Sequence, residues 1–122
     1  MKASERSTQI WAVLAWSARS RQNITYGQLA QICGGLARGL GGWLEPIQSY
    51  CIINELPPLT VLVVQQDSGL PGSGFTGATA SEFARAQASV FAYNWLEHEN
   101  PGAEKFELAV KQAPSNGTKR DA

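Results

Sequence analysis

The residues that could do chemistry are few, and nucleophiles and metal ligands are the scarcest among them. The chain of 122 residues has two cysteines and one histidine. Cys33 and Cys51 form neither a Cys-x-x-Cys pair nor a Cys/His cluster, and both are predicted to be small buried hydrophobes. His98 stands beside Glu97 and Glu99 at a predicted helix end, where a histidine fits the helix dipole. We therefore expect no catalytic residue, no metal and no cofactor, and no enzyme.

A second set of residues has the chemistry to contact phosphate groups. Arg19, Arg21 and Gln22 fall in a polar connection that follows the first predicted helix, and Arg38 falls on a later predicted helix. Arginine donates paired hydrogen bonds that match phosphate oxygens. For each of these side chains the alternative is an ordinary solvated residue. The glycine-rich run at 69–75 is not a phosphate loop, because it lacks the lysine and the following helix that such a loop needs.

Two predicted helices position these polar residues. Apolar residues recur at helical spacing from Thr8 to Ala18, with Ser4 or Ser7 as a candidate cap. Thr25-Tyr26-Gly27-Gln28 fits a capping box, and Leu29, Ala30 and Ile32 give the next helix its buried side. Gly34-Gly35 is a suitable stop for this helix.

The following segments predict a longer helix and then an extended ribbon. Helical spacing runs from about Leu36 to Asn54, with a kink near Gly42–Pro46, or two abutting helices, expected. The β-branched run Leu59–Gln65 predicts a buried strand, Asp67-Ser68-Gly69 predicts a turn, and residues 70–75 predict an irregular return. Two helices followed by a β-hairpin are typical of a winged helix-turn-helix.

The rest of the chain predicts a helical cover. A second capping-box match at 79–82 precedes a helix that is apolar on more than one face and is expected to be largely buried. Asn100-Pro101 suggests the cap and first position of a last helix, with Phe106, Ala109 and Val110 inward. We expect one domain over residues 1–112, of the α+β class but mostly helical, and a disordered tail over 113–122.

The amino-acid composition limits the kinds of partner that can be expected. Ten basic and ten acidic residues give a net charge of zero, and charged residues make up only 16% of the chain. Residues 1–54 carry five basic and two acidic side chains, whereas residues 81–110 carry two basic and five acidic ones. This imbalance permits a face directed at nucleic acid without demanding one. Apolar runs are too short to span a bilayer, and no secretory leader is evident, so we expect a cytoplasmic protein without membrane contact.

Three short motifs occur in order along the first part of the chain. They are Thr-Tyr-Gly-Gln-Leu-Ala at 25–30, Leu-Ala-Arg-Gly-Leu-Gly at 36–41 and Asp-Ser-Gly-Leu-Pro-Gly at 67–72. Together with Ile10-Trp11, they resemble the winged-helix DNA-binding domain of alkylguanine-DNA alkyltransferases and alkyltransferase-like proteins. The resemblance covers about residues 8–75. It implies that Arg38 enters the duplex where a flipped base has left, and that Tyr26 helps to turn the nucleotide out.

The chain departs from this family at the methyl-accepting site. Where the family has Pro-Cys-His-Arg, this sequence has Thr60-Val61-Leu62-Val63. Without the cysteine, the histidine and the arginine, alkyl transfer by that mechanism is excluded.

Two hypotheses follow for the function. The first is a non-enzymatic winged-helix protein that binds duplex DNA weakly or with assistance, through Tyr26, Arg38, Arg19, Arg21, Gln22, Thr25 and Ser68. For Tyr26 the alternative is a half-buried aromatic that packs the start of its helix. The second hypothesis is a protein-interaction module with the same fold, such as a regulatory, immunity, antitoxin-like or inhibitor protein, or a homodimer.

Overall fold

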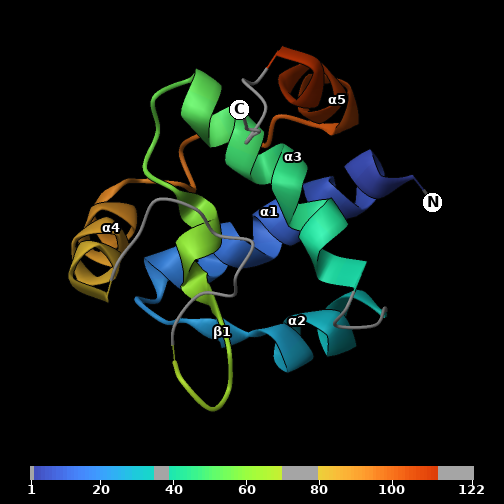
Figure 1. Ribbon diagram of the computed structural model, residues 1–122. Coiled ribbons are helices and arrows are strands. Elements are labelled where there is room, and N and C mark those ends of the chain that lie inside the picture. The colour runs from blue at the N-terminus through green and yellow to red at the C-terminus, as the bar shows by residue number, and fades with distance from the viewer. Residues whose placement is uncertain (1, 35–38, 70–79, 113–122) are drawn as a thin grey trace, which may run out of the picture.

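The computed structural model describes residues 2–34, 39–69 and 80–112, and these residues form a mostly helical fold with one small sheet (Figure 1). Helix α1 lies at the centre and contacts each of the other helices. Helices α3 and α5 pack on one part of it, α2 and β1 lie at another, and α4 lies at the flank. The elements are α1 (Ala3–Arg19), β1 (Ile24–Thr25), α2 (Tyr26–Cys33), α3 (Leu40–Ile53), the 3₁₀ helix η2 (Leu59–Leu62), β2 (Val63–Val64), α4 (Ala80–Ala92) and α5 (Ala103–Gln112).

Helix α1 confirms the predicted amphipathic pattern, but it begins earlier than expected. Its first residue is Ala3, so neither Ser4 nor Ser7 caps it. Both serines instead lie inside the helix and link it to other helices. The Ser7 hydroxyl donates to the Trp43 carbonyl of α3 at 2.6 Å, and the Ser4 hydroxyl donates to Glu107 of α5 at 2.7 Å. The hydroxyls of Ser4 and Ser7 therefore bond to other helices, although the local sequence predicted that one of them would cap α1.

Helix α2 confirms the predicted capping box. The Gln28 amide donates to the Thr25 hydroxyl at 3.1 Å, and the Gln28 side chain accepts from the Thr25 amide at 3.0 Å. Gly34 ends the helix with a left-handed backbone (φ 75°), a conformation that costs glycine little. Ile32 was expected to point inward, and this is wrong, since it is 60% exposed.

The predicted strand over Leu59–Gln65 is largely wrong. Leu59–Leu62 form a 3₁₀ helix, and only Val63–Val64 are extended. These two residues pair with β1 in parallel, with Ile24 opposite Val63. The 3₁₀ helix and the strand are buried throughout, and a short buried apolar run has no periodicity that distinguishes helix from strand. The return arm expected at 70–75 lies outside the described residues.

Helix α3 runs from Leu40 to Ile53 with Pro46 inside it. The structure assigns one helix here, not two abutting helices. Residues 35–38, which include Arg38 and the expected helix start at Leu36, lie outside the described residues. The tail at 113–122 lies outside them as well.

Helices α4 and α5 are less buried than the sequence predicted. From Glu82 to Ala92 in α4, only Val90 is buried, so the expectation of a largely buried helix is wrong. In α5, Phe106 and Ala109 point inward as predicted, but Val110 is 41% exposed. That helix starts at Ala103, so Pro101 is not its first residue. Each of these helices therefore buries one side and leaves the other exposed.

Candidate functional site

The basic connection predicted to contact phosphate is exposed. Arg19 ends α1, Arg21 and Gln22 follow it, and all three side chains face solvent. The backbone beneath them is fixed, because the Gln22 amide donates to the Ser17 carbonyl at 2.9 Å and the Arg21 amide donates to the Ala18 carbonyl at 3.0 Å. The end of α1 therefore has a hydrogen-bonded backbone, and its polar side chains extend into solvent.

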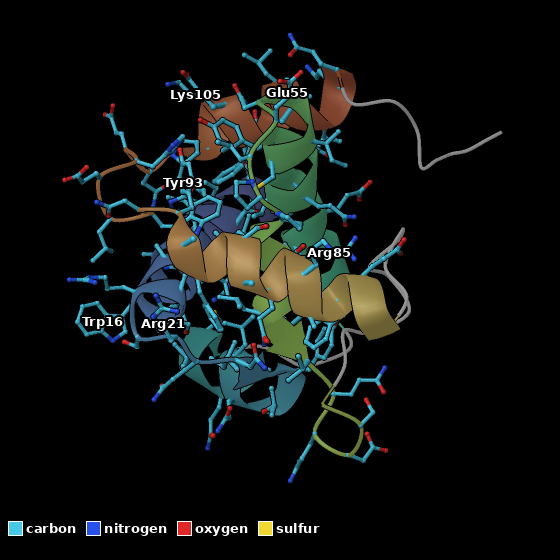
Figure 2. The ribbon with its side chains drawn as sticks, turned by 90° about the vertical axis from the view of Figure 1, so that its left-hand side faces the viewer. Trp16, Arg21, Glu55, Arg85, Tyr93 and Lys105 are labelled. Atoms are coloured by element: carbon cyan, nitrogen blue, oxygen red, sulfur yellow. The ribbon has the colours of Figure 1, made fainter. Side chains whose placement is uncertain are left out.

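Arg21 has an uncommon backbone for its residue type. Its φ is 56°, in the left-handed region that glycine normally occupies after a helix. A side chain in this region costs on the order of 1 kcal/mol relative to glycine. Figure 2 shows Arg21 near the end of α1, on the same side of the view as Trp16. Glu55, after the end of α3, has the same φ of 56°.

Thr25 and Tyr26 lie at the start of α2 and have structural partners. The Thr25 oxygen accepts from Gln28 as part of the capping box, so only its hydroxyl hydrogen is left to donate to another group. Tyr26 is half-buried and packs against the hydrophobic core. This matches the packing alternative, while part of the ring stays accessible.

Ser68 lies beyond β2, in a turn closed by the Gly69 amide, which donates to the Gln65 carbonyl at 2.8 Å. Because Thr25 pairs opposite Val64 in a parallel sheet, the Ser68 turn and the start of α2 leave the same edge of that sheet. Arg19 and Arg21 precede the opposite edge. The two polar groups are therefore separated by the length of the sheet, whose strands are two residues long, about 7 Å.

Arg38 lies outside the described residues, but both ends of the connection that carries it are fixed by α1. The Arg6 guanidinium donates to the Cys33 carbonyl at the end of α2 and lies 5.2 Å from the centre of the Trp43 ring in α3. Ser7 donates to the Trp43 carbonyl. This role of Arg6 was not predicted, because nothing in local spacing relates residue 6 to residues 33 and 43.

His98 has a hydroxyl partner on each ring nitrogen. Tyr50 lies 3.1 Å from its Nε2 and Tyr93 lies 2.8 Å from its Nδ1. The ring also lies beside Trp11, at 5.6 Å between centroids. Burial raises the pKa of Tyr50 above its usual value, with nearby Cys51, Tyr93 and Glu99 adding smaller effects. His98 and Tyr93 lie in the segment after α4, and their contacts join this segment to Tyr50 of α3 and Trp11 of α1.

The cysteines are free and buried, as predicted. Burial raises the pKa of the Cys33 thiol, and the nearby Arg6 charge offsets part of the rise. Burial raises the pKa of Cys51 to about 11, although a hydrogen bond with the backbone of Leu59 opposes the shift. Both thiols are protonated at neutral pH and are therefore poor nucleophiles.

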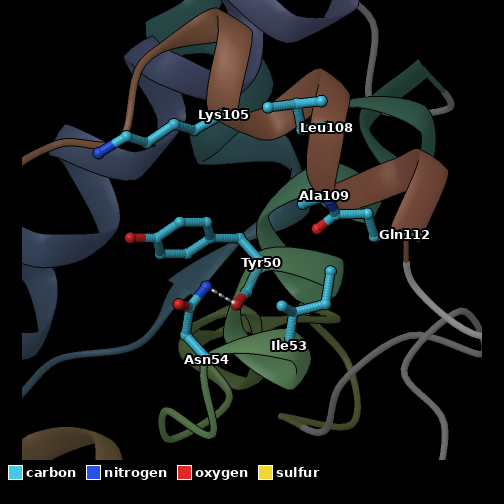
Figure 3. Close-up of a pocket in the computed structure, with 7 residues that line it drawn as sticks. All are labelled: Tyr50, Ile53, Asn54, Lys105, Leu108, Ala109 and Gln112. Carbon is cyan, nitrogen blue, oxygen red and sulfur yellow. Dashed lines mark hydrogen bonds between the residues drawn. The ribbon is translucent and has the colours of Figure 1, made fainter.

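A shallow cavity of about 160 Å³ lies between α3 and α5 (Figure 3). Lys105 is the one charged side chain in its lining, and the Asn54 amide is bonded to the Tyr50 carbonyl at 2.9 Å. This lining has no acid–base pair. The lining residues are Tyr50, Ile53, Asn54, Lys105, Leu108, Ala109 and Gln112.

Searches for metal and membrane sites among the described residues gave negative results. No group of His, Cys, Asp and Glu side chains in residues 2–34, 39–69 and 80–112 could hold a metal ion. In the same ranges, no helix combines the length and the apolar character that crossing a membrane requires.

Comparison of the chain with protein-family models, curated proteins and solved structures gives no match. The resemblance to alkyltransferases therefore rests on the motifs quoted from the sequence.

Proposed function

We propose that this protein is a non-enzymatic DNA-binding protein that contacts the duplex with the α1–β1 connection and the start of α2. The observation that carries the proposal is the exposure of Arg19 and Arg21 and the backbone conformation of Arg21. Both are exposed, and Arg21 keeps its side chain on a left-handed backbone that favours glycine. Phosphate contacts would account for a basic side chain at a position where glycine fits better.

The alkyltransferase-like motifs are the second support for the proposal. The Thr25–Ala30 motif falls on the capped start of α2, and the Ser68 motif follows β2 from the same edge of the sheet. In this proposal Arg38 enters the duplex, Tyr26 crowds the nucleotide backbone, and Thr25, Gln22 and Ser68 donate to phosphates. Such contacts fix the register of a protein on DNA without reading its sequence.

Charge limits the expected affinity. The basic residues of the proposed surface belong to the first half of the chain, and five of the ten carboxylates lie in residues 81–110. With a net charge of zero, the protein gains little from long-range attraction to DNA. We therefore expect weak binding, or binding assisted by another protein.

The absence of catalysis in the proposal rests on the thiols. Val61 and Leu62, at the place of the family's reactive cysteine, are fully buried core residues. The thiols that the chain does have, Cys33 and Cys51, are buried and protonated. Neither could attack an alkylated base without opening the core.

The test is fluorescence polarisation on a labelled random duplex at about 50 and about 200 mM salt. We expect binding that weakens steeply with salt, and severalfold weaker binding by Arg19→Ala, Arg21→Ala and Arg38→Ala. Arg85→Ala is the matched control, since Arg85 is an exposed arginine on α4, outside this surface. Equal binding by all four variants, or no salt-dependent binding, would contradict the proposal.

A second candidate function, a protein-interaction module, is favoured by one observation. Leu108 is 53% exposed and Ile53 is 36% exposed, and both line the cavity between α3 and α5. Adjacent exposed apolar side chains beside a hollow are typical of protein contacts. Under this hypothesis, Leu108→Glu should abolish the co-purification of a protein partner. Val110→Glu, on the other flank of α5, should leave the partner bound.

A further inference from the structure

Trp16 is the one tryptophan of the four that the fold leaves largely in solvent. It is 64% exposed, whereas Trp11 and Trp95 are each 2% exposed and Trp43 is half-buried. It lies on the outward face of α1 with Gln9, Ala12 and Arg19. Figure 2 shows Trp16 at the edge of the molecule, pointing away from the ribbon, with Arg21 on the same side of the view. The core therefore gives no reason for a large aromatic side chain at this position.

The surroundings of Trp16 are polar and basic. Arg19 follows it by three residues, which places the two side chains next to each other on the helix surface. Arg21 follows on the closed helix end, and residues 16–23 contain no carboxylate. A flat aromatic ring beside two guanidinium groups has the parts of a nucleic-acid contact that combines base stacking with phosphate binding.

We propose that Trp16 stacks on an unpaired base while Arg19 and Arg21 bind the phosphates beside it. The preferred ligand is then duplex DNA interrupted by unpaired nucleotides. This inference rests on the proposed DNA-binding function and deepens it, because it names the class of DNA. In an intact duplex both faces of each base are covered by its neighbours, so an indole ring outside the helix has no base to stack on.

Charge and composition favour this ligand over a protein. A tryptophan at a protein interface is normally surrounded by other groups that exclude water. The neighbours of Trp16 on α1 are Arg19 and Ser20, which are exposed and polar, Ala12, which is small, and Val13, which is half-buried against the core. A polyanion with a free base face complements this surface better than an apolar protein patch does.

The test compares two labelled DNAs of the same sequence, one an intact duplex and the other with a short gap of unpaired thymidines. We expect wild-type protein to bind the gapped DNA at least about fivefold more tightly, since stacking of a single base has an effect of this size. Trp16→Ala and Trp16→Leu should bind gapped DNA no better than duplex, and Trp16→Phe should retain a preference. All three should bind the intact duplex like wild type.

The leucine variant separates stacking from simple apolar contact, because leucine keeps the apolar surface and lacks the flat ring. Equal binding of gapped and intact DNA by wild type, or a preference that survives in Trp16→Ala, would overturn the inference. So would self-association in sedimentation that Trp16→Ala abolishes. Salt-dependent duplex binding without a gap preference removes this inference alone, whereas absence of binding to either DNA removes the proposed function as well.

Discussion

The two faces of α1 each carry a tryptophan, and one is buried while the other is exposed. Trp11 points inward, is 2% exposed, and contacts Tyr50, Trp95, His98 and Phe106 through its ring. Trp16, five residues later on the same helix, is 64% exposed. Five residues rotate a helix by about 140°, so the second indole ring turns away from the core. Residue type alone therefore does not separate a core tryptophan from an exposed one.

Polar groups on the two sides follow the same division. On the inner side, both ring nitrogens of His98 have tyrosine partners, and the hydroxyls of Ser4 and Ser7 bond to other helices. On the outer side, the backbone of the α1–β1 connection is bonded while its arginine side chains extend into solvent. Polar residues with internal partners stabilise the fold, whereas exposed ones on a fixed backbone are available to a ligand.

The largest expected difference between the two faces is in stability. Trp11→Ala should lower the free energy of unfolding by about 3–5 kcal/mol, because it removes a fully packed aromatic side chain. Trp16→Ala should change it by less than about 0.5 kcal/mol. Urea denaturation followed by circular dichroism measures both. Similar losses in the two variants would show that the faces do not differ as described.

The pH dependence of stability tests the burial of Cys51 on the inner side. Since the pKa of Cys51 is raised to about 11, its folded state holds a proton that the unfolded chain loses above its ordinary pKa of 9.0. The contribution of this thiol is therefore fully present below pH 9 and is lost as pH rises towards 11. The expected loss is roughly 2 kcal/mol.

The control for this prediction is Cys51→Ala, because tyrosines titrate in the same range. The difference in unfolding free energy between wild type and variant, measured in urea from neutral to alkaline pH, should shrink as the pH rises. A constant difference would mean that the thiol is not held in its protonated form by burial.

The smallest effect concerns the outer side. Arg21→Gly should raise the free energy of unfolding by about 1 kcal/mol, because glycine adopts the left-handed backbone without a side-chain penalty. The same variant should bind duplex DNA severalfold more weakly if Arg21 contacts phosphate. Thermal denaturation and polarisation on one preparation measure both changes. A gain in stability with unchanged DNA binding would leave Arg21 without a role in the proposed site.

Local signals in the sequence were sufficient for some elements. The capping box at Thr25 and the left-handed stop at Gly34 were predicted and observed, because both depend on residues within a few positions of each other. The amphipathic stripe of α1 was also predicted, from the spacing of its apolar residues. The α4 helix was predicted correctly as a helix and wrongly as a buried one.

The candidate site was predicted only in part. The exposed arginines at 19 and 21 were identified from the sequence, but the exposure of Trp16 was not, since four tryptophans look alike without a fold around them. The Arg6 contact with Cys33 and the two tyrosines on His98 were also not predicted. These contacts join residues that are far apart in the chain.

The sequence by itself determined where α2 starts and stops and that α1, α4 and α5 are helices, because capping, glycine conformation and apolar spacing act over a few residues. Only the tertiary structure decided that Leu59–Leu62 form a 3₁₀ helix, that Val63–Val64 pair in parallel with Ile24–Thr25, and which tryptophan faces solvent. Those outcomes depend on which surfaces meet, and meeting surfaces are set by the packing of the whole domain around α1. A local pattern cannot contain that information, since the same apolar run is stable in either conformation once it is buried.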